Sequence, residues 1–284
     1  MDGASKALFL AAISNGGRAS LKQLSVDHRV LRSCMQHRGA QIPAVNEALK
    51  NVLPASIASA HNLETLFLKD VGMGSDQAAS FAASLCTLDH LTQLHLSGAI
   101  RYNQDTQSLL AAEKGLAAAV ATVSTLQNVA LESVLPHVVL PVLQLQALTS
   151  LTLACHSSHS LSKFFTRLKS LQHLQRLHVP SLVMHSSQVK HLAAAVAELP
   201  ELTYLGLHQN HFFDNAPMVT DLLQCGSTKL RHLDLSGQSD RQASDVGMAA
   251  VADLVRCKIT LWHVSGCEGI VARSGMLPFS CVAC

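Results

Sequence analysis

The sequence predicts an α/β solenoid, a single elongated domain of stacked repeats, and three observations support this prediction. A six-residue aliphatic pattern, L-x-x-L-x-L, recurs along most of the chain. Segments with helical spacing of apolar residues follow several of its copies. Leu supplies 46 of the 284 residues, beside abundant Ala and only 4% aromatic residues. Recurrence at a near-fixed period is typical of solenoids, in which each repeat buries its apolar face against its neighbours.

The composition excludes several other classes of protein. Apolar residues make up 48% of the chain and charged residues 14%, which is the opposite of a disordered segment. The formal net charge is +2 with both signs mixed, so we expect no nucleic-acid partner. No stretch approaches the ~20 apolar residues that a membrane span needs.

The pattern has seven clear copies, such as LETLFL at residues 63–68, and two degenerate ones. The degenerate copies lie at residues 21–26 and 259–264. From residue 63 onward, successive copies start 28, 35, 22, 26, 28, 28 and 29 residues apart. A step that is so often close to 28 indicates one structural unit used repeatedly.

Helix signals stand between the copies. Thr106 is placed to cap a helix over residues 107–120, and residues 186–199 form a second helical pattern that stops at Pro200. Residues 245–255 have the same character. The third repeat is irregular, because Pro136 and Pro141 predict a broken helix or an extended segment there.

The repeated residues resemble the leucine-rich repeat family, in particular its ribonuclease-inhibitor-like class. The resemblance implies a curved horseshoe with parallel β-strands on the concave face and α-helices on the convex face. On this basis we divide the chain into an N-terminal capping region with a degenerate first repeat (residues 1–62), the leucine-rich repeats (63–267), and a C-terminal cap and tail (268–284).

One family feature is mostly missing. The family places an Asn three residues after the last Leu of each strand, where it bonds to the backbone of a neighbouring turn, and here only Asn210 fits. The equivalent positions are Val71, Ala99, Val134, His156, Leu182, Gln238 and Cys267. We therefore expect apolar filler at most of these turns.

The predicted binding surface follows from the solenoid geometry. The Leu positions are buried, whereas the intervening x positions point along the concave face. Tyr and Arg, frequent anchors of protein interfaces, gather in the C-terminal half of that face. The predicted partner-binding residues are Phe67, His95, Arg176, His178, Tyr204, His208, Arg231, His232, Asp234 and His263. The alternative is that any solenoid exposes such residues without using them.

Metal and lipid chemistry have weaker signals. The motifs at residues 155–159 (CHSSH) and 208–211 (HQNH) have ligand-like spacing but no matching second pair, so we predict no metal and no cofactor. The last four residues, 281–284 (CVAC), resemble a prenylation box with Cys281 as the lipid acceptor. A tail with two exposed thiols is the alternative.

No phosphate loop, nucleophile elbow or H-E-x-x-H motif occurs, so we predict that the chain is not an enzyme. The predicted function is a monomeric, cytoplasmic interaction module or adaptor that binds a protein partner on its concave face. Scattered Cys residues and the absence of an N-glycosylation acceptor favour the cytoplasm.

Two alternatives to this function stay open. One is a small-GTPase regulator resembling Ran GTPase-activating protein, although residues 268–284 lack that family's acidic tail. The other is the substrate-recognition arm of a ubiquitin ligase.

Overall fold

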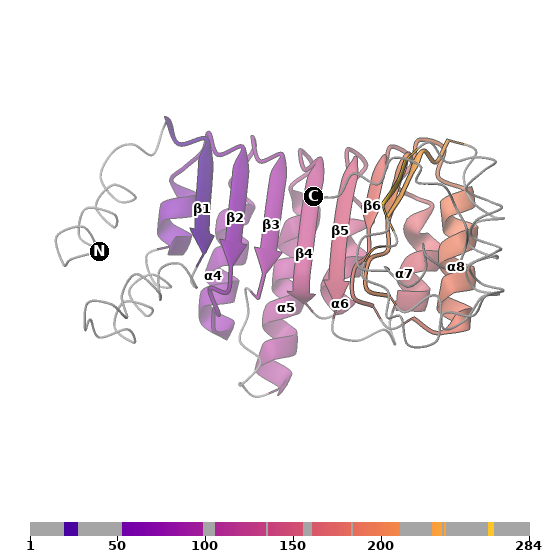
Figure 1. Cartoon of the computed structure of the whole chain (residues 1–284). Coiled ribbons are helices and arrows are strands. Elements are labelled where there is room, and N and C mark those ends of the chain that lie inside the picture. Colours follow the sequence, from indigo (N-terminus) through magenta and orange to yellow (C-terminus); the bar gives the residue numbers. More distant parts are fainter. Residues whose placement is uncertain are drawn as a thin grey trace, which may run out of the picture. The chain divides into compact units, whose positions relative to one another are not determined.

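A computed structural model of the chain describes residues 20–27, 53–98, 106–134, 136–155, 161–182, 184–210, 229–234, 236 and 261–263. The chain divides into two compact units, residues 1–147 and residues 148–284. Each unit alternates parallel strands with helices, so the fold belongs to the α/β class and is compatible with a solenoid (Figure 1). None of the described helices is long and apolar enough to cross a membrane. The domain boundaries at residues 62 and 267 stay predictions.

Among its described residues, the first unit contains four parallel strands that pair in chain order. The strands are β1 (Gln23–Asp27), β2 (Thr65–Lys69), β3 (Gln93–Ser97) and β4 (Asn128–Val134). The labelled helices are α4 (Ser75–Leu85), α5 (Thr106–Thr122) and α6 (Pro136–Val142), and residues 53–58 are also helical. Helix α5 packs between α4 and α6, and all three lie behind the strands (Figure 1). No described helix of this unit covers the front of its strands (Figure 1).

The described part of the second unit repeats this design with five strands. The strands are β5 (Ser150–Cys155), β6 (Arg176–His178), β7 (Tyr204–Gly206), β8 (His232–Asp234) and β9 (Leu261–His263), which again pair in parallel and in chain order. The helices are α7 (Leu161–Leu168) and α8 (Ser186–Ala197), which pack against each other.

Every predicted copy of the repeat pattern contains a strand, including the two degenerate copies. Burial alternates along β1, β2, β6 and β8 as expected for one packed face and one open face, whereas Ser97 at the end of β3 and Gly206 at the end of β7 are also buried. In β2, Leu66 and Leu68 are 0% exposed, whereas Phe67 between them is half-buried. The strand predictions are therefore confirmed. The described pattern positions from residue 63 to residue 233 are buried as predicted, whereas Leu21 in the first degenerate copy is half-buried.

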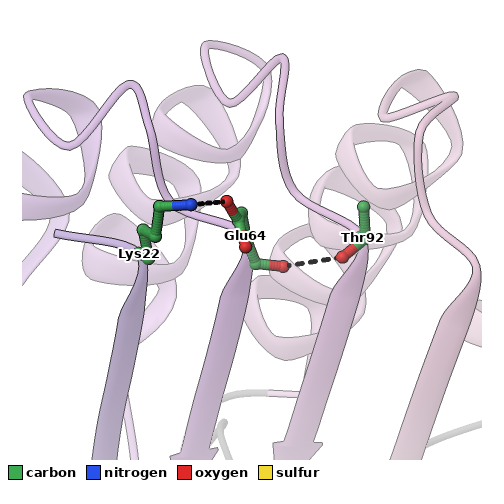
Figure 2. A network of polar contacts seen from close by, with 3 residues as sticks. All are labelled: Lys22, Glu64 and Thr92. Carbon is green, nitrogen blue, oxygen red and sulfur yellow. Dashed lines mark hydrogen bonds and ion pairs between the residues drawn. The ribbon is translucent and has the colours of Figure 1, made fainter. Parts of the chain in front are cut away.

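A ladder of backbone hydrogen bonds joins neighbouring repeats where the chain enters most of the described strands, and we call it the entry ladder. Figure 2 shows the side-chain contacts of Lys22, Glu64 and Thr92 that accompany it. The Lys22 carbonyl oxygen accepts two N–H bonds, from Glu64 at 2.8 Å and from Thr65 at 3.0 Å. The Glu64 carbonyl oxygen accepts N–H bonds from Thr92 at 2.9 Å and from Gln93 at 3.0 Å. The Thr92 hydroxyl adds a third bond to that oxygen at 3.1 Å, and the Lys22 ammonium pairs with the Glu64 carboxylate at 2.7 Å. One carbonyl thus holds two successive residues of the next repeat.

The second unit uses the same ladder. The carbonyl oxygens of Thr149, Gln175 and Thr203 each accept two N–H bonds from the start of the next strand, at 2.8–3.1 Å. The Thr203 hydroxyl donates to the Gln175 carbonyl oxygen at 3.2 Å, as Thr92 does in the first unit. Each of these carbonyls is therefore satisfied by the adjacent repeat.

The helices differ from their predicted bounds in small ways. Thr106 is the first residue of α5 rather than the residue before it, and α5 continues to Thr122. Helix α8 ends at Ala197, two residues before the predicted end. Residues 136–142 form the short helix α6, in which Pro136 occupies the first position, where no N–H donor is needed. The predicted helix at residues 245–255 lies outside the described residues.

Asn210 forms the predicted bonds to a neighbouring turn. The residue is only 4% exposed. Its Nδ2 donates to the Val179 carbonyl oxygen at 2.6 Å and to the His208 carbonyl oxygen at 3.1 Å. Its Oδ1 accepts the Leu182 N–H at 2.8 Å. Val71 and Leu182 occupy equivalent positions as buried apolar filler, as expected. The Asn thus replaces packing by hydrogen bonds at one turn.

We predict that Asn210→Ala destabilises the protein by about 1–3 kcal/mol, because it leaves the buried Leu182 N–H and Val179 carbonyl without this partner. Urea unfolding followed by far-ultraviolet circular dichroism measures the change. The matched control is Lys190→Ala, an exposed substitution on α8 that we expect to stay within ±0.5 kcal/mol. Equal unfolding midpoints for Asn210→Ala and the control would contradict this account of the turn.

Candidate functional site

Strand pairing places the predicted residues of β6, β7 and β8 in two columns. Residues at equivalent positions stand opposite one another in the parallel register. The first column consists of Arg176, Tyr204 and His232, and the second column consists of His178, Gly206 and Asp234. Between the columns, Leu177, Leu205 and Leu233 are at most 1% exposed and point to the opposite face. The predicted sharing of one face is therefore confirmed for these strands.

The first column is a stack centred on Tyr204. The Arg176 guanidinium carbon lies 5.5 Å from the centre of the Tyr204 ring, within the range of a cation–π contact. On the other side, the Tyr204 and His232 rings lie 6.5 Å apart at an interplanar angle of 32°. Arg176 is exposed and the two rings are half-buried, so the stack presents one cationic and two aromatic side chains on the open face.

The second column depends on the missing side chain at Gly206. A Cβ atom at this position would overlap the Cδ2 atom of the His178 ring and would lie 3.0 Å from Cε1 of Tyr204. The His178 ring therefore occupies the space that a side chain on β7 would fill. Because β7 is the strand between β6 and β8, this space brings His178 toward Asp234.

The side chain of His208, two residues after β7, contacts the side chain of His178. The Nε2 atom of His178 and the Nδ1 atom of His208 form a hydrogen bond of 2.7 Å, and the ring centres are 4.7 Å apart. Hydrogen bonds hold the backbone of this turn in place, because the His208 carbonyl oxygen accepts one from Asn210 Nδ2 at 3.1 Å and one from the Ser181 N–H at 3.0 Å. The same Asn210 that joins the turns thus positions His208.

Asp234 completes the group from β8. Its Oδ1 accepts the Ser236 N–H at 2.9 Å, and its Oδ2 lies 3.5 Å from the Tyr204 hydroxyl. Burial raises the pKa of the Tyr204 hydroxyl, the Asp234 charge and hydrogen bond raise it further, and the Arg176 charge opposes them. The Tyr204 hydroxyl is therefore kept protonated, as a donor toward Asp234.

The other predicted residues of this unit are partly described. Arg231 is exposed directly before β8, and its N–H joins the entry ladder through the Thr203 carbonyl. His263 lies on β9 opposite Asp234 in the register, but its side chain lies outside the described residues. Cys281 also lies outside the described residues. So do residues 156–159 of the CHSSH motif and residue 211 of the HQNH motif.

Phe67 and His95 form a separate contact in the first unit. Their rings lie 4.3 Å apart on β2 and β3. The His95 Nε2 atom is buried and lies 3.6 Å from the Glu132 carboxylate on β4, a separation too long for a good hydrogen bond but suited to charge pairing. The interaction with His95 lowers the pKa of Glu132, with Ser97 and Lys69 acting in the same direction against partial burial.

Sequence reasoning missed two features of these surfaces. Glu132 was not predicted, although the residue after the last Leu of a strand shares the open face and its charge was a usable signal. His178, His208 and Asp234 were predicted on one face, but their convergence as possible metal ligands was missed, because it joins residues from different repeats and no short motif along the chain contains it. The column register offered a signal for it, since His178 and Asp234 occupy the same position two repeats apart.

A scan against protein-family models found no family that matches the chain. A search of curated proteins likewise found no match.

We predict that Glu132→Gln reduces stability near pH 6, by no more than about 1 kcal/mol because the pair is partly exposed. The folded carboxyl has a lowered pKa, so its contribution is present above the ordinary value of 4.5 and is lost as the pH falls through the lowered pKa. Urea unfolding at several pH values should therefore show the difference near pH 6 and its progressive loss as the pH falls below 4.5. Asp89→Asn, at an exposed acid of the same unit, is the control. A difference that grew toward acidic pH would contradict the predicted sign.

Proposed function

We propose that this chain is a leucine-rich repeat interaction module that acts as a cytoplasmic monomer and binds a protein partner on the open face of its strands. The observation that carries the proposal is the stack of Arg176, Tyr204 and His232 on β6, β7 and β8. Arg and Tyr are the residue types most often found as energetic anchors of protein interfaces.

Preorganisation supports this role for the stack. A flexible Arg side chain loses about 0.5–1.5 kcal/mol of conformational freedom when a partner immobilises it. Arg176 already has a partner in the Tyr204 ring, and Tyr204 is ordered by His232 and Asp234 around it. Much of the ordering cost is therefore met before binding, which favours affinity without a large interface area.

The placement on strands supports the same role. Side chains on a hydrogen-bonded strand are held more rigidly than side chains on a loop, and a broad open face suits a protein partner better than a small molecule. The surface offers hydrogen-bond donors and acceptors beside the rings, because Arg231 and Asp234 flank the stack. Such a mixture of aromatic and polar groups is typical of specific, reversible interfaces.

We predict that the variant Arg176→Ala/Tyr204→Ala/His232→Ala loses the partner that the wild-type chain recovers. Affinity purification with quantitative mass spectrometry measures the recovery, and we expect a loss of at least about tenfold because two anchor residues are removed. The matched control carries Lys163→Ala/Arg167→Ala/Lys190→Ala, three exposed substitutions on α7 and α8.

The control variant should recover the partner at the wild-type level. Equal recovery by the wild type and the first variant, with both folded by circular dichroism, would reject the stack as the binding surface. Loss in the control variant alone would place the interface on the helices instead.

A further inference from the structure

Three metal-binding side chains converge beside the stack. The Nε2 or Nδ1 atoms of His178 and His208 and a carboxylate oxygen of Asp234 all lie within 4.8 Å of one another. All three residues are half-buried, and they come from β6, from the turn after β7 and from β8. We propose that these residues bind one divalent transition-metal ion, with Zn²⁺ as the ion that fits best.

The distances suit a metal centre after small movements. Zn–N and Zn–O bonds of about 2.0–2.2 Å in a tetrahedral site place neighbouring ligand atoms about 3.3 Å apart. The two imidazole nitrogens, now 2.7 Å apart, need to separate by about 0.6 Å, while the carboxylate oxygen moves inward. Rotation of half-buried side chains about their χ angles covers such movements without a change in the strands.

The surroundings support the site in three ways. Gly206 leaves room for the His178 ring, since a Cβ atom there would overlap it. The Ser236 N–H binds Asp234 Oδ1 and so orients the carboxylate. Asn210 fixes the backbone at His208. Partners of this kind, which hold the ligands rather than the ion, commonly change metal affinity by 10–100-fold.

The donor set determines the class of ion. Two imidazole nitrogens and one carboxylate favour Zn²⁺, Co²⁺, Ni²⁺ or Cu²⁺ over Mg²⁺ and Ca²⁺, which take oxygen ligands almost exclusively. Three protein ligands leave a fourth position for water or for another ligand, as in zinc sites that are not purely structural. The proposal departs from the expectation of no metal, and it does not depend on the proposed interaction function.

The test is a titration of the full chain with Zn²⁺ and, for spectroscopy, with Co²⁺, after chelator treatment and under a metal-compatible reductant. Calorimetry gives the stoichiometry and affinity of each ion. We expect His208→Ala and Asp234→Asn each to weaken one Zn²⁺ equivalent by at least tenfold, because each alters a ligand. Gly206→Ala should weaken the same equivalent although it alters no ligand, since the added Cβ displaces His178.

The matched control is His232→Ala, which removes an imidazole from the same face but not from this group. It should bind Zn²⁺ like the wild type. His208 lies outside the strands, so its variant tests the site even if a strand variant fails to fold, and circular dichroism of each variant confirms folding. Wild-type binding by folded His208→Ala, equal weakening in His232→Ala, or a Co²⁺ spectrum dominated by thiolate bands would each overturn the proposal.

Discussion

The entry ladder is the constraint on which the rest of each unit depends. A single carbonyl oxygen before most of the described strands accepts the N–H groups of two successive residues in the next repeat, as Lys22 does for Glu64 and Thr65. This arrangement fixes the parallel register at the first residue of the strand. A slip of one residue would exchange the buried Leu positions for the polar ones. The ladder therefore keeps Leu66 and Leu68 in the core and leaves Phe67 on the open face.

A fixed register also explains why candidate functional residues form columns. Arg176, Tyr204 and His232 occupy the same position in successive repeats, so their side chains lie side by side whatever their chemical type. The strands β6, β7 and β8 are only three residues long, and the backbone around them is bonded at both ends. The entry ladder holds their starts, and Asn210 holds the turn that follows β7. Side chains that act together are therefore carried on a closely tied part of the backbone.

The sequence was enough to predict these columns but not what happens within them. The positions of Leu predict which strand residues are buried and show a repeat period near 28 residues. Together these two features predict that Tyr204 lies beside Arg176. The meeting of His178 with His208 depends instead on the path of the chain after β7, where Gln209 takes a positive φ and Asn210 bonds back to Val179. The sequence also left two alternatives at helix α6, a broken helix or an extended segment. Pro136 suits the start of a helix, whereas Pro141 removes a hydrogen-bond donor inside it.

The two units show how one side chain in a column changes its chemistry. In the first unit, Phe67 fills its position on β2 and its ring contacts His95 on the next strand, while Glu132 pairs with that His from β4. The imidazole is thus engaged by immediate neighbours. In the second unit, Gly206 leaves the equivalent position on β7 vacant, so His178 extends into it and approaches groups from the turn after β7 and from β8. Because the ladder fixes the register, the strands beside Gly206 keep their positions, and the missing side chain affects only its immediate neighbours. The loss of a single side chain therefore converts a row of pairwise contacts into a point where three ligand-type groups converge.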